Sequence, residues 1–148
     1  MTDYAILIMG VLYSNTNKIF SSNEIAIHTN LNQATVAKLV KILSANNFIK
    51  TIRGINGGCV LLKTPNEIRL VDIIQAIEGP IALTSCVEGV DQSCAVRNSC
   101  FMNGNWNKIN NVIYKALAKI NLNELYEPSF TFPLQKENNY NHSKDIQE

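Results

Sequence analysis

The sequence predicts a mainly α-helical protein with one small β-hairpin, and three observations lead to this fold class. Apolar residues recur with helical spacing in several segments of the 148-residue chain. A glycine-rich loop separates two short strand-like runs near the middle. The hydrophobic content of 46% can fill a core, while the longest early apolar stretch, Ala5 to Leu12, is too short to span a bilayer.

Three helices are expected in the first half of the chain. Residues 3–13 are apolar on all sides and predict a buried first helix. Ser21-Ser22-Asn23-Glu24 offers N-cap residues for a second helix, which Thr29-Asn30 ends. Asn32 suits the N-cap of a third, amphipathic helix that runs to about Asn46. Two short helices joined by a tight polar turn are typical of a helix-turn-helix.

A β-hairpin is predicted directly after these helices. The strand-like runs 48–53 and 59–62 flank the loop Gly54-Ile55-Asn56-Gly57-Gly58. A helix-turn-helix followed by a hairpin is a winged helix, so we assign residues 1–64 to a winged helix-turn-helix domain. Cys59 alternates with buried positions of the second strand, which favours a packed side chain over a ligand.

The second half of the chain has a different organisation. Residues 65–83 are expected to connect through a helix over 71–78, which Gly79-Pro80 stops. Residues 84–103 have no periodicity and hold three of the four cysteines. A long helix is expected within 104–125, from about Gly104 to Ile120, and the tail 126–148 is polar enough to predict disorder. The apolar stripe of the long helix includes Trp106, Ile109, Ile113 and Leu117.

Charge is unevenly distributed between the two halves. Residues 1–63 contain six Lys or Arg against two Asp or Glu, a net charge of +4, whereas residues 64–148 contain seven against ten, a net charge of −3. A basic first half indicates an anion-binding module.

Double-stranded DNA is the predicted partner of this module. A recognition helix points its N-terminal residues toward base edges in the major groove, where Asn and Gln suit adenine, Lys suits guanine, and Ala or Thr methyl groups suit thymine. The candidate DNA-binding residues are Asn32, Gln33, Ala34, Thr35, Lys38 and Lys41 in the third helix and Arg53, Asn56 and Gly57 in the wing, where Arg53 suits a narrow minor groove. Lys18, Lys50 and Lys63 are better placed for phosphates. The alternative is a set of ordinary solvated residues on a small helical domain.

The cysteines point to metal or redox chemistry. The features of a signal peptide are missing, so we expect a cytoplasmic protein, in which structural disulfides are rare. Cys86, Cys94 and Cys100 form a C-x7-C-x5-C pattern that allows thiolates of one loop to converge on an iron–sulfur cluster. Zinc usually takes more closely spaced pairs. The alternatives are three unrelated thiols or a redox pair that forms a disulfide.

Other classes of function fit the sequence less well. Only His28 and His142 are present, and no nucleophile–His–carboxylate grouping or phosphate-binding glycine loop is visible, so an enzyme is not expected. An iron–sulfur electron carrier would have no use for a recognition helix and wing. A protein-interaction module that has lost DNA binding is a further alternative, and a gel shift that does not weaken with added salt would favour it.

Several segments together resemble the Rrf-two family of bacterial winged-helix regulators, which has IscR-like and NsrR-like branches. They are Thr2-Asp3-Tyr4-Ala5, Arg53-Gly54, Gly57-Gly58, Asp72-Ile73-Ile74 and Glu78-Gly79-Pro80. The run from Glu78 through the cysteines to Gly104-Asn105-Trp106 is similar to regulators of SUF-type iron–sulfur assembly operons.

This resemblance implies a homodimer built on the long helix, with a 2Fe–2S or 4Fe–4S cluster on Cys86, Cys94 and Cys100. It also implies repression of cluster-assembly genes at a palindromic operator. The IscR-like branch has a histidine three residues after the third cysteine, and Asn103 stands there in this chain. The nitric-oxide-sensing branch has an aspartate in the first helix that reaches the partner's cluster, and Asp3 matches it, although Asp3 also suits a helix N-cap. A metal-free thiol-redox regulator of the same fold is the alternative.

Overall fold

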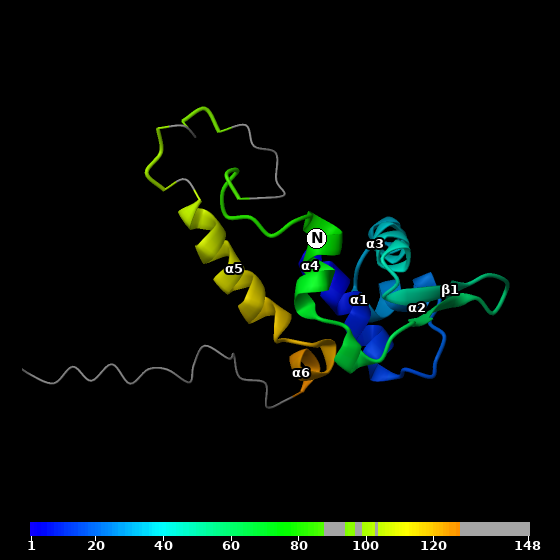
Figure 1. Cartoon of the computed structure of the whole chain (residues 1–148). Coiled ribbons are helices and arrows are strands. Elements are labelled where there is room, and N and C mark those ends of the chain that lie inside the picture. Colours follow the sequence, from blue (N-terminus) through cyan, green and yellow to red (C-terminus); the bar gives the residue numbers. More distant parts are fainter. Residues whose placement is uncertain (88–93, 97–98, 103, 128–148) are drawn as a thin grey trace, which may run out of the picture.

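A computed structural model describes residues 1–87, 94–96, 99–102 and 104–127, and it has the mainly helical architecture that the sequence predicts (Figure 1). The elements are α1 (Thr2–Ser14), α2 (Ser22–Thr29), α3 (Gln33–Ala45), β1 (Ile49–Ile52), β2 (Gly58–Leu61), the 3-10 helix η1 (Pro65–Glu67), α4 (Leu70–Glu78), α5 (Asn105–Ala118) and α6 (Leu122–Tyr126). β1 and β2 form an antiparallel hairpin. In the described part of the chain, no helix combines the length and apolarity that crossing a membrane requires.

α1 is the centre of the hydrophobic core. It contacts α2, α3, α4 and β2, and its buried side chains recur at helical spacing, which places them on one face. The expectation that this helix is buried on all sides is wrong, because Tyr4 is exposed and half of the Leu7 side chain faces solvent. The buried residues of α1 are Ala5, Ile8, Met9 and Leu12.

Polar side chains define the helix ends, as the sequence predicts. The hydroxyl of Ser21 accepts a hydrogen bond from the backbone N–H of Glu24 at 3.2 Å, and the Glu24 carboxylate accepts one from the Ser21 N–H at 2.8 Å. This reciprocal capping box fixes the start of α2. Asn30, in the left-handed conformation with φ 55°, ends α2. Asn32 then caps α3, so the turn between the two helices is short.

A backbone bridge joins the hairpin to the segment between α1 and α2. Phe20 exchanges two hydrogen bonds with Cys59, at 3.0 and 2.7 Å. The Cys59 side chain is only 2% exposed, which confirms the prediction of a packed residue, and burial raises the pKa of its thiol. β2 begins at Gly58, one residue earlier than expected.

The long helix of the second half is shorter than its apolar stripe suggests, because it ends at Ala118 rather than near Ile120. The Leu70 N–H donates to the carbonyl of Ile120, and the Leu122 N–H donates to the carbonyl of Ile68, both at 2.8 Å. These bonds divert the backbone from the helix and bury Ile120 and Leu122 in the body of the protein. Beyond this point, α6 follows, and residues 128–148 of the expected tail lie outside the described residues.

Tyr126 connects α6 to α1. Its hydroxyl donates a hydrogen bond to the carbonyl of Ile6, its ring lies 5.1 Å from the ring of Tyr13, and burial raises its pKa. We expect Tyr126→Phe to lower the free energy of unfolding by about 1 kcal/mol, the usual net value of one hydrogen bond. Tyr126→Ala should cost clearly more, because the ring contacts are also lost. Urea unfolding of the two variants measures both effects, and equal stability of Tyr126→Phe and the unaltered chain would contradict the assignment.

Candidate nucleic-acid interface and cysteine segment

α3 presents the predicted base-reading side chains to solvent because its other face is locked into the core. Val36, Leu39 and Leu43 are fully buried on that inner face. On the outer face, Thr35 is partly exposed and the other candidates are exposed, namely Asn32, Gln33, Ala34, Lys38 and Lys41. The side-chain oxygen of Asn32 accepts a hydrogen bond from the Thr35 N–H at 2.8 Å, so it serves first as the helix cap.

The wing candidates lie at the outer end of the hairpin. Arg53 and Asn56 are exposed, and Gly57 is partly exposed. A Cβ atom at Gly57 would lie 2.3 Å from the carbonyl oxygen of Ile52, so the turn itself requires glycine there. Gly57 therefore shapes the wing whether or not it touches a nucleic acid.

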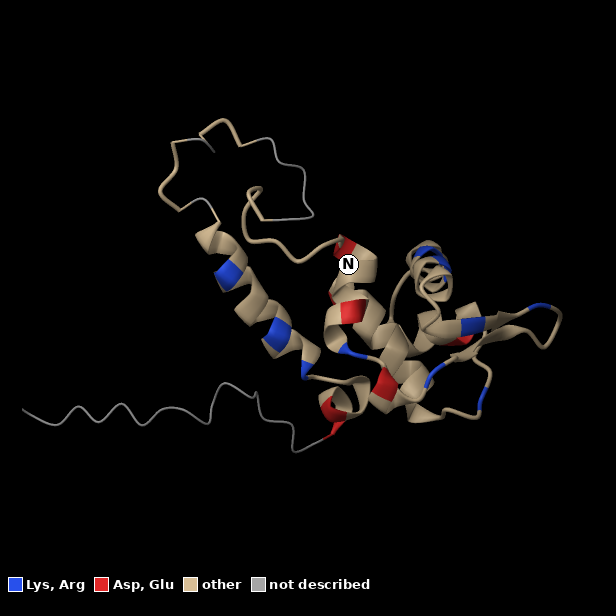
Figure 2. Cartoon of the chain, viewed as in Figure 1, with Lys and Arg blue, Asp and Glu red and all other residues tan. Residues whose placement is uncertain are grey.

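The charge of this surface has one sign. No Asp or Glu occurs between Ile25 and Asn66, a stretch that covers α3 and the hairpin. Figure 2 shows Lys and Arg on α3 and along the hairpin, while Asp and Glu lie mostly on the rest of the molecule. The basic residues of the stretch are Lys38, Lys41, Lys50, Arg53 and Lys63. Such a surface attracts polyanions.

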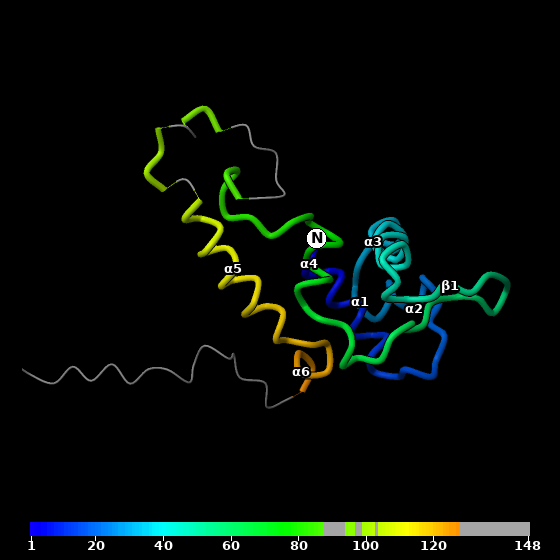
Figure 3. The backbone as a smooth tube through the Cα atoms, viewed as in Figure 1, coloured from blue at the N-terminus to red at the C-terminus, as the bar shows by residue number. Residues whose placement is uncertain are grey.

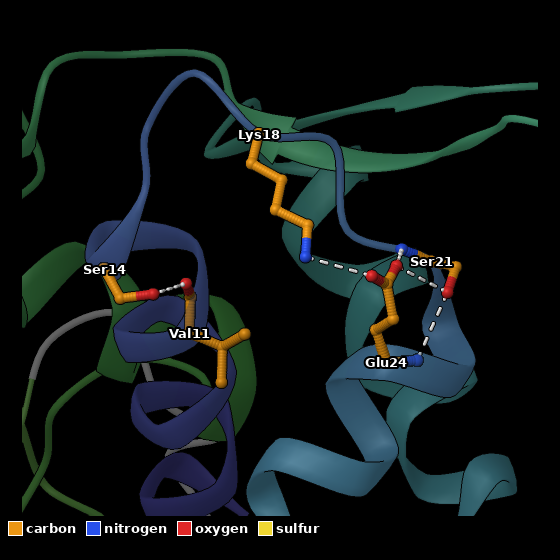
Figure 4. A network of polar contacts seen from close by, with 5 residues as sticks. All are labelled: Val11, Ser14, Lys18, Ser21 and Glu24. Atoms are coloured by element: carbon orange, nitrogen blue, oxygen red, sulfur yellow. Dashed lines mark hydrogen bonds and ion pairs between the residues drawn. The ribbon is translucent and has the colours of Figure 1, made fainter.

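Lys18 behaves differently from the other candidate phosphate contacts (Figure 4). Its ammonium group pairs with the Glu24 carboxylate at 3.1 Å and lies 4.5 Å from the centroid of the Phe20 ring. Hydrogen bonds from the Ser21 N–H and hydroxyl, followed by the Lys18 ammonium, lower the pKa of Glu24 to about 2. Lys18 therefore supports the start of α2, and this role could not be predicted because Lys18 and Glu24 meet only after folding.

The predicted cysteine ligands lie in the segment between α4 and α5. Cys86, Cys94 and Cys100 are partly buried, and none of them is in a disulfide. The Thr84 hydroxyl lies 3.0 Å from the Cys86 sulfur, within hydrogen-bond distance. Among the described residues, no three His, Cys, Asp or Glu side chains gather closely enough to hold a metal ion. Residues 88–93, 97–98 and 103 of this segment lie outside the described residues.

The chemistry of this donor set fits an iron–sulfur cluster, since such clusters are held chiefly by cysteine thiolates. Three thiols, all free of disulfide bonds, occur within fifteen residues, whereas the fourth cysteine, Cys59, is sealed in the core. Asp3 is exposed in the first turn of α1, where a negative charge is favoured by the helix dipole. Met1 rather than Asp3 occupies the N-cap position, so the expected cap role of Asp3 is wrong.

Two contacts that the sequence did not reveal fix the start of the cysteine segment and the helix before it. The Asn110 amide in α5 donates to the carbonyl of Ile81 at 2.6 Å, and the Oδ1 atom of Asn110 is buried without a partner among the described residues. At the end of α4, the Glu78 carboxylate accepts hydrogen bonds from the Thr2 N–H and hydroxyl. Asparagines are frequent along α5, so nothing in the sequence distinguishes Asn110.

The predicted dimer stripe lies on a helix that packs only partly within the single chain. Trp106, Ile113 and Leu117 are partly buried, Ile109 is exposed, and α5 contains no fully buried residue. α5 contacts α4, and the cartoon and the backbone tube, drawn from the same side, show it extending away from the winged helix (Figures 1 and 3). Much of its apolar surface is therefore not covered by the described part of the chain.

Comparison with known proteins places this architecture in one family. The family model Rrf2, described as an iron-dependent transcriptional regulator, matches residues 1–128. The HTH-type transcriptional regulator NsrR of Oceanobacillus iheyensis is 30% identical over 84% of this chain and 85% of its own. The HTH-type transcriptional regulator CymR of Bacillus subtilis is 32% identical over 71% and 70%.

Solved structures agree with the sequence matches. The structure of CymR (YrzC), the global cysteine regulator of B. subtilis, superposes with a TM-score of 0.65 at 28% identity and covers 84% of this chain and 91% of that one. T. potens IscR shares the fold with a TM-score of 0.60 at 24% identity, covering 84% and 81%. The chain belongs to the Rrf2 family of winged-helix transcriptional regulators.

Proposed function

We propose that this regulator is a homodimeric repressor of iron–sulfur cluster assembly genes that senses a cluster held by Cys86, Cys94 and Cys100. The observation that carries the proposal is the position of three free thiols in the segment that leads into α5, a helix without a fully buried residue. The description of the family as iron-dependent and the similarity to NsrR support the same reading.

The cysteine segment is suited to control the spacing of two DNA-reading helices. In a dimer formed along Trp106, Ile109, Ile113 and Leu117, the two copies of α3 must lie about 34–36 Å apart to enter successive major grooves. Asn110 ties the start of the segment to α5, and Glu78 ties the end of α4 to α1. A bound cluster supplies a redox-sensitive crosslink between three points of the segment. Asp3 of the second copy is our candidate for the fourth ligand.

The cluster is tested by purifying the full chain without air from cells that build clusters. We expect iron and acid-labile sulfide in about equal amounts, visible absorbance from the cluster, and a dimer in analytical sedimentation. Asp3→Asn should bind its cluster less tightly but should still bind it, because the three cysteine thiolates are unaltered. Colourless, iron-free protein under these conditions would overturn cluster sensing and leave the family assignment intact.

The DNA-reading face is tested at Lys38, which is exposed on α3. Lys38→Ala should bind a selected operator about ten-fold more weakly and with relaxed sequence preference, since one good base contact is worth about 1–3 kcal/mol. Lys115→Ala, an exposed lysine of α5, is the matched control and should bind normally. Fluorescence anisotropy over a range of salt concentrations measures both, and equal binding by the two variants would contradict the assigned face.

A metal-free thiol-redox regulator is the second candidate function. Two observations favour it: the three free thiols and the 32% sequence identity with CymR. The structure of CymR is described as that of a global cysteine regulator. In that case the anaerobic protein would contain no iron, and mild oxidant would join two of the three cysteines in a disulfide that mass spectrometry detects.

A further inference from the structure

The tip of the wing carries an apolar side chain that the fold does not use. Ile55 is fully exposed, the most exposed of the large hydrophobic residues in the described part of the chain. The Gly57 N–H donates to the carbonyl of Gly54 at 3.0 Å, so Ile55 and Asn56 are the two central residues of a β-turn. Such positions normally hold Gly, Pro, Asn, Asp or Ser, and a β-branched apolar residue gives the turn no advantage.

The residues around Ile55 make the tip narrow. Gly54 has φ 117° and nothing within 4 Å of the position where its Cβ would lie, and Gly57 has no side chain. Arg53 and Asn56 flank this ridge and are exposed. The wing therefore ends in a thin strip of backbone with one branched apolar group at its crest, beside a cation and an amide, and it projects away from the helices (Figure 3).

This combination fits the DNA minor groove better than a protein surface. The groove is about 6 Å wide, so it admits a bare backbone ridge but not a wide hairpin. Proteins that bind it combine Arg and Asn with an apolar wedge that partly unstacks one base step. The tip also belongs to the stretch from Ile25 to Asn66, which has no acidic residue. This charge disfavours a basic protein partner and favours a polyanion.

We infer that Ile55 is a specificity-determining residue that inserts into the minor groove beside the site of α3 and unstacks a base step there. This inference rests on the proposed DNA-reading role of α3 and the wing. Pyrimidine–purine steps, TA and CA/TG, unstack most easily. The wedge therefore selects such a step at a position where no side chain needs to read a base edge by hydrogen bonding.

The test uses the full chain and a duplex selected by it from a random pool, with 2-aminopurine placed in turn at each step outside the α3 contact. We expect fluorescence to rise at one pyrimidine–purine step with the unaltered protein and with Ile55→Phe, and to stay flat with Ile55→Ser. Ile55→Ser should bind the duplex about ten-fold more weakly and should lose the preference for that step over AA. Leu62→Ser, which removes an exposed apolar side chain near the base of the same hairpin, should behave like the unaltered protein.

Salt dependence separates this role from a phosphate contact. Ile55→Ser should leave the slope of log affinity against log salt unchanged, whereas Arg53→Ala should reduce it by about one. Unchanged binding and fluorescence in Ile55→Ser, or weaker binding without any unstacking by the unaltered protein, would overturn the wedge. Dissociation of the dimer by Ile55→Ser would overturn it too, by assigning the side chain to a protein interface. Failure of the unaltered protein to select any duplex would instead overturn the DNA-reading role itself.

Discussion

Cys86→Ala is expected to purify without iron and to bind the operator at least about ten-fold more weakly than the unaltered chain. Changes to residues that merely support metal ligands typically cost about 10–100-fold in metal affinity, so removing a ligand should cost at least as much. Of the three thiols, Cys86 lies nearest in sequence to Ile81, whose carbonyl accepts a hydrogen bond from Asn110 of α5. The Thr84 hydroxyl lies 3.0 Å from the Cys86 sulfur. Loss of Cys86 therefore removes the cluster contact that lies nearest in sequence to the point where Asn110 of α5 holds Ile81.

Cys59→Ala is the matched control for this prediction. Cys59 is 2% exposed, its thiol pKa is raised by burial, and it belongs to the core between β2 and α1. We expect this variant to keep its iron and its operator affinity and to lose only about 1 kcal/mol of stability, a typical value for a small core deletion. Iron content after anaerobic purification and anisotropy with the operator measure both variants. Iron retained by Cys86→Ala and lost by Cys59→Ala would reverse the assignment of ligand and core thiol.

The fold could be predicted where local interactions determine it. The capping box of Ser21 and Glu24 and the cap at Asn32 lie within three residues of their partners, so the sequence reveals both helix starts. The end of α5 could not be predicted in the same way. It depends on hydrogen bonds between residues about fifty positions apart, from Leu70 to Ile120 and from Leu122 to Ile68, which compete with a helical stripe that continues in sequence.

The same distinction between local and long-range contacts applies to the candidate site. The outer face of α3 follows from the spacing of its buried residues, and the packing of Cys59 follows from alternation along a strand. The ion pair of Lys18 could not be predicted, because an exposed lysine in a polar loop gives no sign of a carboxylate that folding brings to 3.1 Å. Asn110 was missed for a related reason, since its partner is a backbone carbonyl and any residue type supplies one.

Gly58→Ala is expected to destabilise the whole winged helix, because a methyl group at this position meets the Phe20 backbone first, with the Ile19 side chain next at 2.9 Å. The new Cβ would lie 2.3 Å from the carbonyl oxygen and 2.6 Å from the carbonyl carbon of Phe20. Relief requires separation of Phe20 from Cys59, which breaks the two hydrogen bonds that join the hairpin to the segment before α2. Overpacking costs about 1–3 kcal/mol, and the two hydrogen bonds add about 1 kcal/mol each.

Gly54→Ala gives the comparison that isolates this mechanism. Gly54 has positive φ but open space around it, so alanine there meets only a backbone penalty of about 1–2 kcal/mol at the far end of the same hairpin. Thermal and urea unfolding should therefore rank Gly58→Ala as clearly less stable than Gly54→Ala. Gly58→Ala should also lose operator binding, because the wing reaches DNA only if the Phe20–Cys59 bridge fixes its direction. Equal stability of the two variants would mean that the hairpin can leave the helices at little cost, and the wing would then be too loosely held to select a base step.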